Sequence, residues 1–280
     1  MANESTYAGI SGIIASVYET ALFTAQEGGV VAPLIQTFQD TNSPAPRIWG
    51  TYSGGTFAAV SEATDMSQQA LNAAAGGTLT PAVYGQMVLL TNRRLRADPQ
   101  GAQRDAGRHL GQTMAATVDT LLVGLFSTFT GGTVGTAGGT LTWANIFRAQ
   151  AYLRANKIFG SYSCVLRPEQ WYYLTSLTSG VPQLMINNSI AEGIMGNYYQ
   201  ASFAGIDFFV DANITSGTAA VGGMFAREAA ALDIRVPFQI EPQYNASYSG
   251  NGAWELNASM EFAYGLYRPT YGVQLIGTSS

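Results

Sequence analysis

The residues that could carry nucleophilic or acid–base chemistry are few in this 280-residue chain. His109 is its only histidine and Cys164 is its only cysteine. His109 lies among apolar residues at helical spacing, which favours a packed or surface-paired side chain over a catalytic one. Cys164 lies in an apolar stretch, where cysteine usually serves as a small core residue. Because neither residue has a predicted base beside it, we expect no nucleophilic site.

Motifs that hold metals, phosphates or cofactors are missing from the sequence as well. No His/Cys cluster has the spacing of a zinc site, and Gly160-Ser161-Tyr162-Ser163 lacks the closing glycine of a nucleophile elbow. The glycine-rich run from Gly131 to Gly139 matches neither a dinucleotide motif nor a P-loop. Acidic pairs such as Glu62 and Asp65 are too common in proteins to indicate a site. The sequence therefore predicts a protein that is not an enzyme, with no catalytic, cofactor-binding or metal residues.

The low number of charged residues points instead to a surface that other subunits cover. Charged residues make up 11% of the chain, against about 25% in a typical domain. A compact monomer of 29.7 kDa would expose ~11,600 Å², or about 370 Å² per charge. A monomer with that surface would associate. Fifteen tyrosines and a single lysine, Lys157, fit this interpretation, because interfaces are rich in aromatic residues and poor in lysine.

The charge balance and the single cysteine limit the partners and the compartment. A net charge of −5 argues against a sequence-reading nucleic-acid binder. Five arginines nevertheless cluster near the start of the longest predicted helix: Arg93, Arg94, Arg96, Arg104 and Arg108. They could bind phosphate or pair with carboxylates of the same or a neighbouring subunit, and pairing is the simpler explanation. With no basic signal-peptide lead, no uncharged 18-residue run and no possible internal disulfide, we expect a soluble chain from a reducing cytoplasm, without membrane contact.

The longest predicted element is a helix from Pro99 to Phe129. Asp98 can cap its free amides, and proline is favoured at its first position. Apolar residues then recur at three- and four-residue steps: Ala106, Leu110, Met114, Val118, Leu121, Leu122, Leu125 and Phe129. Gly131-Gly132 is predicted to end the helix. Its length of ~46 Å far exceeds the ~19 Å radius of gyration of a compact chain of this size, so it would cross the whole fold as a spine.

The segments before this helix cannot stand alone. We expect an amphipathic helix over Tyr7–Glu27, an extended stretch over Val30–Phe38 and then a proline-rich linker. Strands at Ile48–Val60 and Tyr84–Leu90 are predicted to form a long hairpin around a polar, alanine-rich middle. An isolated hairpin is not stable in water. The arm and the hairpin therefore need a partner surface.

The segments after the long helix predict a mixed unit and a β-rich return, which makes the chain α+β. Gly131–Thr140 is interpreted as a hinge or linker. The mixed unit is predicted as a helix at Trp143–Asn156, a strand at Ser163–Leu166, a short helix at Pro168–Leu177, a loop with a short helix at Leu184–Tyr199 and a strand at Ile206–Val210. Return strands are predicted at Leu232–Ile240, Trp254–Tyr264 and Tyr271–Ile276. The second of these has the clearest period-2 alternation, with one face buried and one wet.

This order of parts resembles a tailed-bacteriophage major capsid protein of the Hong Kong ninety-seven-like fold. Thr80–Leu95 resembles the returning hairpin strand and its lead into the spine, and Ala115–Leu125 resembles the spine's Asp-then-apolar ending. Val165–Trp171 resembles the strand-to-helix step of the axial domain, and Ala263–Thr270 resembles the final strand. The resemblance implies an N-terminal arm (1–46), an extended hairpin loop (47–92), a peripheral domain with the spine helix (93–132), a mixed α/β axial domain (133–226) and peripheral return strands (227–280).

The resemblance also implies a function. Copies would form hexamers and pentamers in an icosahedral shell around double-stranded DNA, which they would hold without sequence-specific binding. The shell would be a virion capsid assembled in the cytoplasm of a bacterial host, with portal and scaffolding proteins and a possible decoration protein as partners. Some members join subunits through a lysine–asparagine bond from the extended loop. That loop has no lysine here, so no such crosslink is expected. Because the chain starts almost at the arm, we expect a separate scaffolding protein or none.

Contacts between subunits are predicted from the charges. Glu62 or Asp65 would pair with an arginine of a neighbour, either Arg268 or one of the group Arg93, Arg94 and Arg96. Two alternatives remain open for the function. One is an encapsulin-type compartment that encloses a cargo enzyme, and the other is a tail-tube or other β-rich virion protein, which the long helix disfavours. A small-molecule enzyme comes last.

Overall fold

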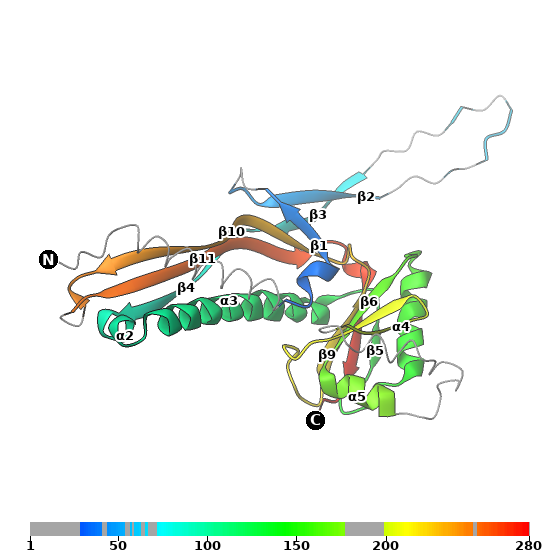
Figure 1. Ribbon diagram of the computed structural model, residues 1–280. Helices are drawn as coiled ribbons and strands as arrows, with labels where there is room; N and C mark the ends of the chain where they lie inside the picture. The colour runs from blue at the N-terminus through cyan, green and yellow to red at the C-terminus, as the bar shows by residue number, and fades with distance from the viewer. Residues whose placement is uncertain are drawn as a thin grey trace.

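The computed structural model describes residues 29–40, 44–53, 57, 59–62, 65–66, 72–176, 199–248 and 251–279. Three sheets organise this part of the chain. A four-stranded sheet lies along one long helix, a six-stranded sheet with two helices lies at one end of that helix, and a two-stranded hairpin projects from the first sheet (Figure 1). This is an α+β chain, as the sequence predicts.

The long helix, α3, spans Pro99–Gly124 and follows the short helix α2 (Asn92–Ala97). The Asp98 side chain accepts a hydrogen bond from the amide of Gly101 at 2.9 Å, which is the predicted N-terminal cap. The helix does not continue to Phe129 as predicted. After Gly124 it tightens into the 3₁₀ turn η2 (Leu125–Thr128), and Phe129 is already extended.

The four-stranded sheet has the order β1 (Gln36–Gln39), β10 (Ala230–Asn245), β11 (Ala253–Leu266) and β4 (Ala82–Thr91). Its long strands β10 and β11 are antiparallel, and α3 covers one face. Leu256, Ala258 and Phe262 of β11 are buried, while the alternating polar residues Glu255 to Glu261 are half-buried. The predicted period-2 pattern is therefore confirmed in part, because Trp254 and Met260 are only half-buried and the polar face is half-buried where the prediction made it wet. The core between helix and sheet contains Leu90, Leu110, Met114, Phe238, Ile240 and Leu256.

The six-stranded sheet has the order β5 (Thr133–Gly135), β12 (Gly272–Gly277), β9 (Ala220–Phe225), β6 (Tyr162–Leu166), β8 (Ile206–Val210) and β7 (Tyr199–Phe203). Helices α4 (Trp143–Ala155) and α5 (Pro168–Ser176) accompany it. The predicted helices at 143–156 and 168–177 and the strands at 163–166, 206–210 and 271–276 are confirmed to within a few residues. Strands β7 and β9 were not predicted.

The pairing of the hairpin differs from the prediction. β2 (Arg47–Ser53) pairs with β3 (Asn72–Leu79), which the sequence placed in the polar middle. The predicted partner, Tyr84–Leu90, is β4 and pairs instead with β11. The reason is side-chain size, because β3 carries glycines where β2 carries a tryptophan. A Cβ on Gly77 would lie 2.4 Å from the indole of Trp49, so the bare backbone of β3 gives the tryptophan room.

Two further expectations are wrong. The extended stretch 30–38 contains the 3₁₀ turn η1 (Ala32–Leu34) with Pro33 in it, and only then β1. The predicted hinge at 131–140 contains β5, which pairs in parallel with β12. The predicted helix at 7–27 and most of the loop at 184–199 lie outside the described residues. No observation tests the division into five segments, which stays a prediction.

Candidate assembly interface

The β2–β3 hairpin stands away from the rest of the fold (Figure 1). Ile48 on β2 is 70% exposed. In the connection beyond the strands, Phe57 is fully exposed and Met66 is 80% exposed. Apolar side chains presented in this way by a projecting element are typical of an interface with another molecule. The hairpin is therefore the first candidate for contact between subunits.

An ion-pair network fixes the base of the hairpin. The Arg47 Nε donates to Oδ2 of Asp233 at 2.8 Å, and the Arg235 Nη2 binds the same oxygen at 2.9 Å. The carboxylate of Asp40 lies 3.3 Å from Nη1 of Arg235 and 3.7 Å from Nη2 of Arg47. The hydrogen bond that Arg47 donates to Asp233 raises the pKa of Arg47 above its ordinary value. Two cations and two carboxylates thus join β2, β10 and the residue that follows β1.

Aromatic contacts support the same joint. The guanidinium of Arg47 lies 4.7 Å from the centre of the Phe38 ring, a cation–π distance. Trp49 packs against Tyr267 with ring centres 5.1 Å apart, and Phe38 packs against the same tyrosine at 5.8 Å. The hairpin therefore leaves the sheet in a direction that packing and charge both set.

A second joint holds the residues before β1 on α3. Asp119 is fully buried, and its Oδ1 accepts the backbone amides of Val30 at 3.0 Å and Val31 at 2.9 Å. Its Oδ2 accepts Nδ2 of Asn213 at 2.9 Å. One carboxylate of the long helix therefore ties together the segment before β1, the helix itself and the β8–β9 connection.

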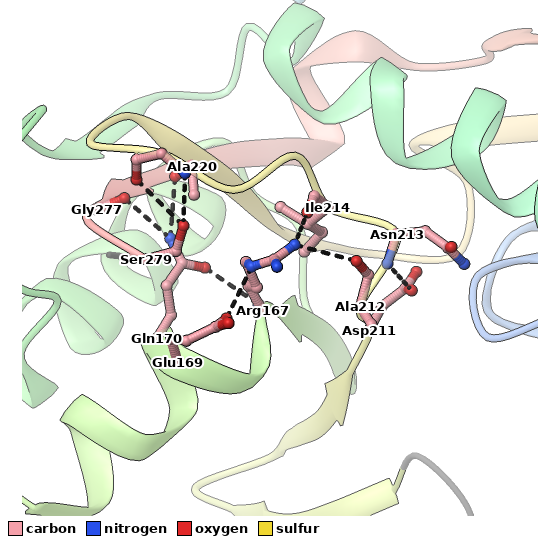
Figure 2. A network of polar contacts seen from close by, with 11 residues as sticks. Arg167, Glu169, Gln170, Asp211, Ala212, Asn213, Ile214, Ala220, Gly277 and Ser279 are labelled. Carbon is pink, nitrogen blue, oxygen red and sulfur yellow. Dashed lines mark hydrogen bonds and ion pairs between the residues drawn. The ribbon is translucent and has the colours of Figure 1, made fainter.

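A third joint lies at the start of α5 (Figure 2). The Arg167 Nη1 donates to the carbonyls of Ala212, at 3.1 Å, and Ile214, while its Nε lies 2.8 Å from Oε2 of Glu169. Gln170 is fully buried and donates to the carbonyl oxygens of Ala220 at 3.0 Å and Gly277 at 3.3 Å. These side chains fix the β8–β9 connection and the end of β12 against α5.

The sequence-predicted contact residues lie apart from these joints. Glu62 and Asp65 are exposed in the connection between β2 and β3, and Arg93, Arg94 and Arg96 are exposed on α2. Arg268 pairs with Glu228 at 3.1 Å and donates to the Tyr271 hydroxyl at 2.8 Å. The structure does not bring the acidic and basic groups together within one chain. Their pairing between subunits stays a prediction.

Sequence reasoning missed the residues that position the hairpin and the segment before β1. Asp233 and Arg235 alternate within an apolar strand, and Asp119 interrupts the apolar stretch of a helix. A polar residue in an apolar run is a signal of a buried, paired group. The pairing of Asp119 with residues 88 and 89 positions away has no local signal.

The residues considered for chemistry have structural roles. Cys164 is fully buried, and burial raises the pKa of its thiol. His109 is exposed on α3, with its Nε2 3.3 Å from Nε2 of Gln86. Among the described residues, no three His, Cys, Asp or Glu side chains gather closely enough to hold a metal ion. None of the described helices has the length and apolar character needed to cross a membrane.

Comparison with solved structures identifies the fold. The capsid of the cyanophage P-SCSP1u matches with a TM-score of 0.70 at 13% identity, over 88% of this chain and 87% of that chain. Mycobacterium phage Che8 matches with a TM-score of 0.66 at 14% identity, over 82% and 84%. The virus-like particle from Pyrococcus furiosus matches with a TM-score of 0.58 at 11% identity, over 94% and 98%. No curated protein matches the chain in sequence.

The matched structures share the fold of this chain, and a protein-family model identifies the class of protein. The model of the phage capsid protein family matches residues 74–275, and the chain belongs to that family. It is a major capsid protein with the Hong Kong ninety-seven-like fold, and its role in the bacteriophage capsid is structural.

Proposed function

We propose that copies of this chain assemble as hexamers and pentamers into an icosahedral shell that packages double-stranded DNA. The single observation that carries the proposal is the projecting hairpin with its exposed Ile48, Phe57 and Met66. The chain offers these side chains no cover of its own among the described residues, so a neighbouring copy would cover them. Burying apolar area contributes roughly 25 cal/mol per Å², which makes such contacts the main source of assembly energy.

The predicted domains map onto this proposal. The predicted arm (1–46) contains the joint of Val30 with Asp119, and the predicted extended loop (47–92) starts at Arg47, where the ion-pair network sets its direction. The predicted peripheral segments (93–132 and 227–280) contain α3, β10 and β11, and the predicted axial segment (133–226) contains α4, α5 and the strands β5 to β9. β12 lies in the predicted return segment but belongs to the six-stranded sheet. β4 lies at the edge of its sheet with Val83 and Met87 exposed, which gives a second surface for contact between copies.

In this proposal the shell assembles in a bacterial cytoplasm, where other proteins take part. A portal and a scaffolding protein would act during assembly, and a decoration protein could bind the outside of the shell. The net charge of −5 suits a lining that does not bind the packaged DNA tightly. The likeness to the virus-like particle from Pyrococcus furiosus favours one alternative, an encapsulin-like compartment that encloses protein.

The proposal is tested by adding charge to the hairpin tip. Sedimentation of purified wild-type chain should show large assemblies, and the double variant Phe57→Asp/Met66→Asp should remain as small oligomers. The matched control, Ser216→Asp/Thr218→Asp, adds the same charge at exposed positions of the β8–β9 connection and should assemble like the wild type. Circular dichroism and thermal unfolding establish that both variants fold. Equal assembly of the hairpin variant and the wild type would refute the proposed role of the hairpin.

Nuclease treatment of the assemblies separates the two kinds of shell. Protected double-stranded DNA in particles from infected cells supports the phage capsid. A protein cargo in the same particles, without protected DNA, supports the compartment.

A further inference from the structure

Two buried carboxyl groups lie where three segments of the chain meet. Asp119 of α3 is fully buried, and Asp211, directly after β8, is 2% exposed. Asp119 already accepts three hydrogen bonds, from the amides of Val30 and Val31 and from the side chain of Asn213. Both of its carboxylate oxygens therefore have hydrogen-bond donors.

Asp211 lacks such donors. Its Oδ1 accepts the backbone amide of Asn213 at 2.8 Å (Figure 2). Its Oδ2 is buried, and no donor among the described residues reaches it. Asn213 links the two carboxyl groups, because its backbone amide binds Asp211 and its Nδ2 donates to Oδ2 of Asp119 at 2.9 Å. Two buried carboxylates held on one residue repel each other, whereas one proton between them turns the unpartnered oxygen into a donor.

The surrounding charges do not supply an alternative partner. On the α5 side, the guanidinium of Arg167 binds the carbonyls of Ala212 and Ile214 and the carboxylate of Glu169. On the side of η1 and β1, Arg227 donates to the carbonyl of Ile35 at 3.4 Å. The α3 residues one turn either side of Asp119 are uncharged. Within the described residues, no arginine or lysine pairs with Asp119 or Asp211.

We propose that Asp119 and Asp211 share one proton, and that this proton locks the segment before β1 and the β8–β9 connection onto α3. Asp211 carries the proton and donates it to the Asp119 carboxylate. Loss of the proton places two negative charges in a buried site and opens the joint at Val30 and Val31. The residues that lead into β1 are thereby released from α3 as the pH rises.

The expected pH dependence follows from the direction of the pKa shift. Burial, followed by the neighbouring Asp119, raises the pKa of Asp211 from 3.8 to about 7. The folded joint therefore holds a proton that the open state has already released above about pH 4. The stabilisation is complete below the pKa of the open state and is lost as the pH rises through the pKa of the closed state. Between these two pKa values, the ratio of closed to open joints falls roughly tenfold for each pH unit.

Hydrogen exchange on the full-length chain, dispersed as subunits, tests the proposal directly. The probe is the protection factor of the peptide that covers residues 29–35, corrected for intrinsic exchange at each pH. We expect protection of the wild type to fall by about 100-fold between about pH 5 and pH 7. The variant Asp211→Asn presents an amide donor to Asp119 at every pH, so its protection should stay constant across this range.

Asp207→Asn is the matched control, because it removes an aspartate from the same strand without touching Asp119, and it should keep the wild-type slope. Constant protection in the wild type, or an unchanged slope in Asp211→Asn, would overturn the proposal. Infrared spectra of the wild type keep the proposal falsifiable should Asp211→Asn not fold. At about pH 6 ordinary carboxyl groups are ionised, so the carbonyl band of one protonated carboxylic acid should be present. Its absence would equally overturn the proposal.

Discussion

The guanidinium of Arg47 binds the carboxylate of Asp233 across an Nε–Oδ2 distance of 2.8 Å, and this contact joins the first residue of the hairpin to a fully buried residue near the start of β10. The Nη2 of Arg235 binds the same oxygen at 2.9 Å. Asp233 therefore has two cations for one buried negative charge, and Asp40 balances the second cation. This charged contact at the base of the β2–β3 hairpin therefore sets the direction in which the hairpin presents its exposed apolar side chains.

Removing this contact should loosen the hairpin. We expect Arg47→Met to lower the free energy of unfolding by about 1–3 kcal/mol, because a hydrogen bond to a buried charged group is lost while Arg235 still neutralises Asp233. Urea unfolding of dispersed subunits measures the change. The matched control is Arg268→Met, whose pair with Glu228 is about half exposed and should contribute about 0–1 kcal/mol. Equal losses in the two variants would contradict the role assigned to Arg47.

Two glycine substitutions should have opposite effects. A Cβ on Gly272 would lie 2.4 Å from the ring of Phe129, so Gly272→Ala should destabilise the fold by about 1–3 kcal/mol. Gly124, the last residue of α3, is exposed, and a methyl group added to it would meet no side chain within 4 Å. Gly124→Ala should therefore stabilise the fold by about 0.5–1 kcal/mol. Thermal unfolding checks both changes, and a destabilised Gly124→Ala variant would show that the glycine is needed for the helix end.

The thiol of Cys164 should be unreactive in the folded chain. Burial raises its pKa above the ordinary range, so mildly alkaline solution does not produce the nucleophilic thiolate. Iodoacetamide at about pH 8.5 should label it only after denaturant is added. Mass spectrometry measures the labelled fraction. Rapid labelling of folded subunits would show that β6 opens readily to solvent.

Assembled particles should contain no covalent links between subunits. Lys157 is the only lysine, and it lies two residues after the end of α4 in a left-handed backbone conformation, with φ of 61°. The hairpin supplies no lysine for an isopeptide bond. A reducing denaturing gel of particles should show a single band at 29.7 kDa. A ladder of larger bands would refute this prediction.

Local pattern was enough to predict the elements with strong periodicity or caps. The helix from Pro99, the two shorter helices and the alternating strand at 254–264 all have such signals, and the structure confirms them. The missed strand β9 contains Gly222 and Gly223, which weaken any strand signal. A Cβ on Gly223 would lie 2.9 Å from the Phe126 ring, so a contact distant in sequence decides this position.

The pairing of the strands and the ion-pair and hydrogen-bond networks depend on residues far apart in sequence. Local sequence pattern could therefore not predict them. β2 lies nearer in sequence to β3 than to β4, but the alanines and glycines of β3 have no strand pattern, whereas β4 has one. The interaction of Arg47 with Asp233 spans 186 residues, and that of Asp119 with Val30 spans 89. The sequence therefore predicted a hairpin that needs a partner surface. Only the tertiary structure identifies the residues that orient this hairpin.

Electron microscopy of the purified wild-type chain tests the central claim most directly. If copies of this chain cover one another's exposed apolar side chains, negative-stain images should show closed shells, from the chain alone or together with a co-expressed scaffolding protein. Uniform, highly soluble monomers under both conditions would contradict the account, because the exposed hairpin tip would then need no neighbour.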